Sequence, residues 1–201
     1  MSFPEPSAAP EESSRWADAA TVIGTFVGVL WLLEVVDQIV NNRLDGLGIE
    51  PREADGLWGI LFAPLLHSGW GHLAANTLPL LVLGFLILLS GITVWARSTA
   101  IIWIVGGVGT WLTGGAHTLH LGASVLVFGW LVFLVLRGFL NRKVGQILVG
   151  LVVIAVYGSL LWGVLPGTPG VSWQGHLFGA IGGGLAAFWM AERDDRLPTR
   201  V

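Results

Sequence analysis

The sequence predicts an all-α, polytopic membrane protein. Of its 201 residues, 54% are hydrophobic and only 11% are charged, whereas a soluble domain carries about 25% charged residues. The mean hydropathy is +0.75. Apolar runs of the length that crosses a bilayer, about 20 residues, recur along the chain. Together these observations predict a bundle of six transmembrane helices.

Six apolar segments can be assigned in order, and several are shorter than a full span. They are residues 19–40, 72–94, 99–112, 124–136, 146–165 and 175–190. The polar stretch 41–55 between the first two is long enough to form its own structure at the surface. Residues 1–18, rich in Pro, Glu and Ser at their start, are expected to be a disordered N-terminal tail that is not cleaved. Residues 19–191 form the membrane domain, and 192–201 a short C-terminal tail.

The basic residues predict the orientation of this bundle. Cytoplasmic loops of membrane proteins carry an excess of Lys and Arg. If the first segment starts inside, only Arg43 and Arg52 lie outside. The eight cytoplasmic residues are then Arg15, Arg97, Arg137, Arg142, Lys143, Arg193, Arg196 and Arg200. Both termini are therefore predicted to be cytoplasmic, in a multi-pass protein of the cell membrane.

This orientation brings five polar residues to the outer ends of segments two, four and six. They are His67, His72, Asn76, Ser124 and His176. The helix from Ser124 to Leu136, just before Arg137, is about 20 Å long at 1.5 Å per residue. The helix from His176 to Ala191 is about 24 Å long. Because the hydrocarbon core is about 30 Å thick, both side chains should lie roughly 6–10 Å below its outer boundary.

Ser124 and His176 are candidates for a nucleophile and its general base. A serine hydroxyl is a weak nucleophile until a base accepts its proton, and a neutral imidazole suits that role. No Asp or Glu lies between Asp55 and Glu192, so the segment offers no acid to orient the histidine. Glu34 and Asp37 precede it, but nothing in the sequence places them beside His176. A Ser–His dyad is therefore favoured, while paired aspartates and an HExxH zinc site are excluded.

The tetrahedral intermediate of such a reaction needs hydrogen-bond donors for its oxyanion. His72 and Asn76 are four residues apart and share a helix face, so both side chains can point at one oxygen. The backbone N–H of Ser124, at a helix start, is a third donor. His67 lies off that face and is interpreted as structural, holding the loop that leads into segment two.

This ordered pattern resembles the rhomboid family of intramembrane serine proteases. It consists of His67-x4-His72-x3-Asn76, then Gly122-Ala-Ser124, then His176 before a Gly/Ala run. The resemblance covers residues 20–191. It implies Ser124 as nucleophile, His176 as base, His72 and Asn76 as oxyanion donors, and transmembrane proteins as substrates, cleaved near the outer face without a cofactor.

The chain departs from the family pattern at three positions. Val125 follows the nucleophile where the family usually has Gly, and its branched side chain stiffens the turn. Phe128 replaces a Tyr that packs on the histidine, so the ring is retained and the hydroxyl is lost. Trp58 is followed by Gly59 rather than Arg in the loop before segment two. Val125 motivates the main alternative, an inactive rhomboid-like protein that binds transmembrane segments.

Other readings remain beside this one. Ser124 alone could be a helix cap, and His176 alone a packing residue. A small transporter with a polar cavity is a third functional class. His117 and His120 lie in the loop before Ser124 and are interpreted as loop histidines rather than metal ligands, because no carboxylate or thiol joins them. The chain has no cysteine and no basic patch for nucleic acid.

The glycines of the last segment are predicted to bring it close to segment four. Gly175, Gly179 and Gly183 follow one another at four-residue steps. Small residues at this spacing let two membrane helices approach closely. Such an approach would bring His176 within reach of Ser124.

Overall fold

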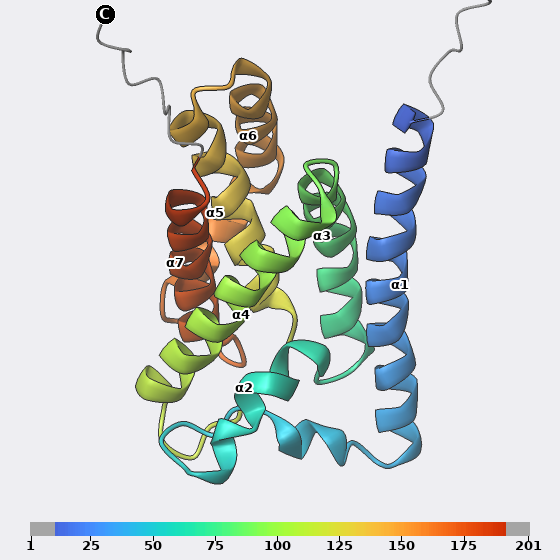
Figure 1. Ribbon diagram of the computed structural model, residues 1–201. Helices are drawn as coiled ribbons and strands as arrows, with labels where there is room; N and C mark the ends of the chain where they lie inside the picture. Colours follow the sequence, from blue (N-terminus) through green and yellow to red (C-terminus); the bar gives the residue numbers. More distant parts are fainter. Residues whose placement is uncertain (1–10, 192–201) are drawn as a thin grey trace, which may run out of the picture.

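The computed structural model describes residues 11–191, which form seven α-helices and four short 3-10 helices without a named strand (Figure 1). The α-helices are α1 Glu11–Ile39, α2 Gly59–Phe62, α3 Trp70–Leu88, α4 Ile92–Thr113, α5 Ser124–Asn141, α6 Val144–Tyr157 and α7 Trp173–Trp189. The 3-10 helices are η1 Leu44–Leu47, η2 Asp55–Leu57, η3 Ala63–Leu65 and η4 Gly158–Val164. The all-α prediction is confirmed.

Five of these segments are long and apolar enough to cross a membrane. They are residues 14–39 of α1, α3, α4, α5, and α6 with η4. The sixth, α7, has 17 residues and packs closely on α5 and α4. The structure is therefore the polytopic bundle that the hydropathy predicts, and α7 is the shortest of its six segments when α6 is counted together with η4.

The helix boundaries differ from the prediction in two places. Helix α1 begins at Glu11, eight residues before the predicted start of segment one. The break between α3 and α4 was predicted at residues 95–98 but falls at residues 89–91. Gly91, in this break, has a φ of 115°. Helix α4 runs through this stretch, and the hydroxyls of Ser98 and Thr99 find partners within the bundle. Ser98 donates to the Trp95 carbonyl, and Thr99 Oγ1 accepts from Trp130 Nε1 at 3.0 Å.

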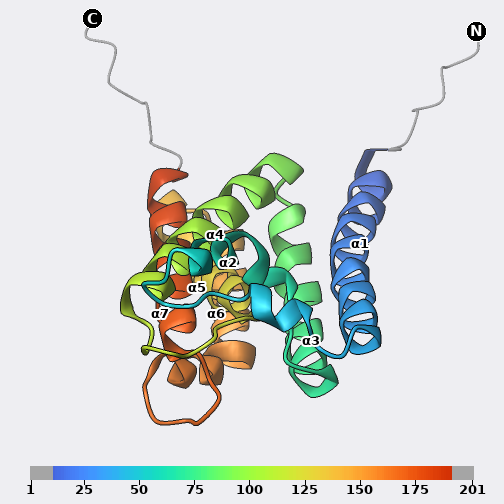
Figure 2. The ribbon, with the colours of Figure 1, turned by 90° about the horizontal axis from the view of Figure 1, so that it is seen from below.

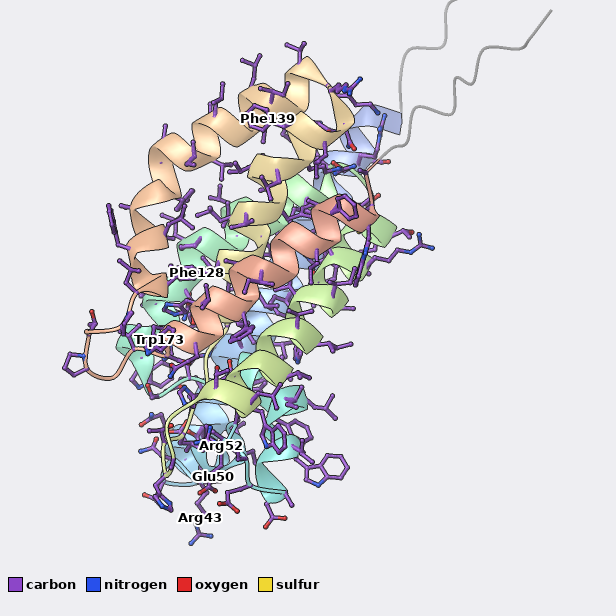
Figure 3. All side chains as sticks on the ribbon, turned by 90° about the vertical axis from the view of Figure 1, so that its left-hand side faces the viewer. Arg43, Glu50, Arg52, Phe128, Phe139 and Trp173 are labelled. Carbon is purple, nitrogen blue, oxygen red and sulfur yellow. The ribbon has the colours of Figure 1, made fainter. Side chains whose placement is uncertain are left out.

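The start of α1 and the end of α7 lie at one end of the bundle, and α2 lies at the other (Figure 1). We call the second end the α2 end. Helices α3, α5 and α7 all begin toward it. Figure 3 places Arg43 and Arg52 at the α2 end and Phe139 of α5 at the opposite end. The two basic residues predicted to be outside are thus on the side away from the end of α5.

Helix α5 lies at the centre of the bundle, where glycines allow close contact with α7. A Cβ at Gly179 would collide with the Val125 carbonyl, and one at Gly183 with the Gly129 carbonyl. The two pairs repeat at the same four-residue step on both helices, so the backbones touch along a stripe. The predicted approach of the last segment to segment four is confirmed.

The polar stretch after α1 forms an ordered cover over the α2 end (Figure 2). The Arg52 guanidinium donates to the carbonyls of Leu112 and Gly114 at the end of α4, at 3.2 and 2.7 Å. Ile49 exchanges two backbone hydrogen bonds with His120, in an isolated bridge to the loop before α5. These contacts fix the loop that carries Ser124.

Candidate active site

Ser124 and His176 meet because α5 and α7 begin side by side at the α2 end. Ser124 is the first residue of α5, and His176 lies in the first turn of α7, after the N-cap Ser172. Ser124 Oγ lies 2.9 Å from His176 Nε2. Both side chains are half-buried. Ser124 and His176, which are 52 positions apart, therefore share a hydrogen bond, and both line the same cavity.

The second ring nitrogen of His176 determines which tautomer is present. His176 Nδ1 lies 2.9 Å from the carbonyl oxygen of Gly163, in η4. Because a carbonyl only accepts, Nδ1 carries the proton and Nε2 is free to accept the Ser124 hydroxyl proton. The Gly163 carbonyl thus performs the orienting role that an aspartate has in a Ser–His–Asp triad.

The face of the His176 ring is held by Phe128. The two rings are stacked, with centroids 4.0 Å apart and an interplanar angle of 10°. Figure 3 shows Phe128 between the levels of Trp173 and Phe139, inward from the α2 end. A Cβ at Gly163 would lie 2.9 Å from the Phe128 ring and 3.1 Å from His176 Nδ1. Glycine at 163 therefore lets the stacked pair approach the η4 backbone.

His72 and Asn76 line the same cavity as Ser124 and His176, and its volume is about 700 Å³. His72 Nδ1 lies 3.3 Å from Ser68 Oγ. Asn76 Nδ2 donates to the His72 carbonyl at 3.1 Å, which uses one of its two amide hydrogens. The four polar residues thus surround one space, on three different helices.

His67 and Gly122 shape the turn before Ser124. His67, 2% exposed, accepts the Ala123 N–H at Nε2 over 3.3 Å, and burial together with nearby His72 lowers its pKa to about 3. It thus holds the turn before Ser124 rather than only the start of α3. Gly122 has a φ of 124°, and a Cβ there would lie 2.5 Å from the His72 ring.

Val125, which follows Ser124, is packed between two glycines. A Cβ at Gly106 of α4 would collide with its side chain, and a Cβ at Gly179 would lie 3.1 Å from it. Val125 is 8% exposed and does not line the 700 Å³ cavity. The branched side chain of Val125 is therefore accommodated in the helix interface.

Two acidic residues of α1, Glu34 and Asp37, make hydrogen bonds with residues close to them in the sequence. Asp37 Oδ1 accepts the Leu44 N–H at 2.7 Å, and Glu34 Oε1 accepts from Gln38. Within residues 11–191, no group of three His, Cys, Asp or Glu side chains is placed to hold a metal ion. The His176 ring contacts Ser124, Gly163 and Phe128.

Two parts of the site were not predicted from the sequence. The Gly163 carbonyl is a backbone group of a 3-10 segment and has no residue signature. Ser172 had a recognisable one, because a serine immediately before an apolar helix is typical of an N-cap. His120, read as a loop histidine, is bonded to that Ser172.

The chain belongs to the rhomboid family, because the family model for the rhomboid domain matches residues 54–193. An uncharacterized protein of Mycobacterium tuberculosis (strain ATCC 25618 / H37Rv) is 50% identical over 194 residues, covering 92% of this chain and 81% of the relative. An uncharacterized protein of Mycobacterium leprae is 47% identical over 185 residues, covering 88% and 73%. The Bacillus subtilis protein named "Putative rhomboid protease YdcA" is 29% identical over 195 residues, covering 90% and 93%. No solved structure matches the chain at a significant level.

Proposed function

We propose that this protein is an intramembrane serine endopeptidase that cleaves transmembrane segments of membrane proteins with a Ser124–His176 dyad. The observation that carries the proposal is the 2.9 Å contact between Ser124 Oγ and His176 Nε2, with Nδ1 bonded to the Gly163 carbonyl. This arrangement leaves the nitrogen that faces the hydroxyl free to accept its proton. Membership of the rhomboid family supports the same activity.

The reaction proceeds by acyl transfer. Ser124 Oγ attacks the scissile carbonyl while His176 Nε2 takes its proton, and the resulting imidazolium then protonates the leaving amine. Asn76, His72 and the Ser124 N–H donate to the developing oxyanion. Water, deprotonated by His176, hydrolyses the acyl-enzyme and restores Ser124. The cavity of about 700 Å³ gives this water a route to the site.

A serine-reactive fluorophosphonate tests the dyad directly. The wild-type protein in detergent should be labelled, and Ser124→Ala and His176→Ala should lose at least about a hundredfold in labelling rate, because a serine without its base is a weak nucleophile. Ser90→Ala, in the turn between α3 and α4, is the matched control and should be labelled normally. Absence of labelling in folded wild-type protein would favour the inactive, segment-binding alternative.

We further propose that the α2 end faces outward and both termini are cytoplasmic. Eight of the ten basic residues are assigned to the other side, in line with the positive-inside rule. Gly46→Cys and Gly145→Cys provide a matched pair, since both glycines are exposed with open space around them, and the chain has no other cysteine.

A membrane-impermeant maleimide applied to intact cells should label the Gly46→Cys variant, which lies in η1. The Gly145→Cys variant, in α6, should be labelled only after the cells are permeabilised. The reverse pattern would place the active site on the cytoplasmic side and overturn the proposed orientation.

A further inference from the structure

His120 joins the loop of the nucleophile to the helix of the base. It is 9% exposed, and each ring nitrogen contacts a hydroxyl. Nδ1 lies 2.7 Å from Ser172 Oγ, the N-cap of α7, and Nε2 lies 2.8 Å from Thr118 Oγ1. This connection lies outside the dyad and its oxyanion donors.

The hydrogen bonds of this network have one direction that satisfies every group. Thr118 Oγ1 donates to the Gly115 carbonyl at 2.7 Å. Since a hydroxyl has a single proton, Thr118 must accept from His120, so Nε2 is protonated. A neutral imidazole then has a bare Nδ1, which accepts the Ser172 hydroxyl proton.

The other end of the network closes on the helix backbone. Ser172 Oγ accepts the Gly175 N–H at 3.3 Å and so caps α7. With the opposite His120 tautomer, Ser172 Oγ would accept two hydrogen bonds, from Gly175 N–H and from His120 Nδ1. The Ser172 hydroxyl proton would then have no acceptor within residues 11–191. The network therefore runs from Gly175 through Ser172, His120 and Thr118 to Gly115.

The surroundings of His120 hold it in place. Its backbone exchanges two hydrogen bonds with Ile49, at 2.8 and 3.0 Å. A Cβ at Gly114 would lie 2.8 Å from Nε2, so the ring is packed against that glycine. Burial lowers the pKa of His120, which keeps the ring in the neutral form that the network needs.

The spacing relates this contact to the dyad. His120 precedes Ser124 by four residues, and Ser172 precedes His176 by four residues. The Ser172 carbonyl also accepts the His176 N–H at 3.1 Å. The 2.7 Å bond between residues 120 and 172 therefore joins the two segments that carry Ser124 and His176.

We propose that His120, through its hydrogen bond with Ser172, is a positioning residue that holds Ser124 and His176 at reacting distance. This inference rests on the proposed function. Its expected effect is on the rate of acylation rather than on substrate affinity, because His120 acts through the geometry of the dyad. Misplacement of a reacting group by about 1 Å can cost on the order of a hundredfold in rate.

Two amide substitutions separate the halves of the network. In His120→Asn the amide oxygen takes the place of Nδ1 and still accepts from Ser172. In His120→Gln the amide reaches the place of Nε2 and keeps only the Thr118 contact. We expect His120→Asn to stay within about threefold of wild type in fluorophosphonate labelling, and His120→Gln and Ser172→Ala to fall about 10- to 100-fold.

Further variants and kinetics check that the loss comes from positioning. Ser172→Thr, which keeps the cap and the hydroxyl, should restore labelling. With a cleavable transmembrane substrate, His120→Gln should lower kcat and leave KM unchanged. The His120→Gln and Ser172→Ala losses should not add in the double variant, since both remove one bond. Wild-type rates in His120→Gln, or equal losses in the Asn and Gln variants, would overturn the proposal.

A second measurement does not depend on activity or on the folding of these variants. Nitrogen NMR of Ser124→Ala protein whose histidine ring nitrogens are isotopically labelled should show a neutral His120 with its proton on Nε2. A proton on Nδ1 would contradict the network. If wild-type protein were not labelled at all while this tautomer was found, the proposed function would fail and the network itself would stand.

Discussion

Replacing Gly122 by alanine is expected to lower fluorophosphonate labelling of Ser124 by at least about a hundredfold. Gly122 has a φ of 124°, which L-residues rarely adopt, and the new Cβ would lie 2.5 Å from the His72 ring. The strain costs on the order of 1–3 kcal/mol. Relief requires either the His72 ring or the turn before Ser124 to move, and a shift of about 1 Å suffices for such a loss.

Gly91→Ala is the matched control for backbone strain. Gly91 has a similar φ of 115°, but nothing lies within 4 Å of its added Cβ, and it lies in the turn before α4. Both variants should lose some thermal stability, and only Gly122→Ala should lose labelling. Equal labelling in the two proteins would mean that the His72–Gly122 contact does not shape the site.

Gly183→Ala is expected to lower the free energy of unfolding by about 1–2 kcal/mol. The added Cβ would collide with the Gly129 carbonyl of α5, a backbone group that cannot rotate away. Overpacking costs typically about 1–3 kcal/mol, and here the helices must separate along the stripe that also holds Gly179 against Val125. The gain in helix propensity, about 1 kcal/mol, offsets only part of this cost.

The neighbouring Gly184→Ala supplies the control. Its Cβ would lie 3.6 Å from Leu136 Cδ1, an ordinary contact, so this variant should be as stable as wild type or more stable by up to about 1 kcal/mol. Unfolding in mixed micelles, followed by tryptophan fluorescence, measures both. Similar stability of the two variants would contradict the close contact of α5 and α7.

The sequence supported the helical architecture because lipid imposes strong constraints on it. The lengths of the apolar segments and the four-residue glycine spacing of α7 depend on hydropathy and side-chain size. Both properties can be read from each residue in the sequence. The break between α3 and α4 was misplaced for a related reason. Arg97 and Ser98 interrupt the apolar run, but α4 continues through both, and the Ser98 hydroxyl donates to the Trp95 carbonyl within the helix.

The candidate site was predictable only where side chains carry it. Ser124, His176, His72 and Asn76 could be proposed because their types and spacing suggest chemistry. The part played by His120 depends on which hydroxyls stand 2.7–2.8 Å from its two nitrogens. Those partners come from a nearby turn and from a residue 52 positions away, and no pattern in one sequence pairs them.

The carbonyl that orients His176 has an evolutionary consequence. A triad aspartate can be lost by one codon change, whereas the carbonyl of residue 163 is present whatever amino acid is encoded there. Selection can therefore act on this partner only indirectly, through the course of the η4 backbone and the small size of residue 163, where a Cβ would press on Phe128 and His176. In this protein the third partner of the Ser124–His176 pair is inherited as a backbone shape, and a comparison of sequences would register it only as a glycine at position 163.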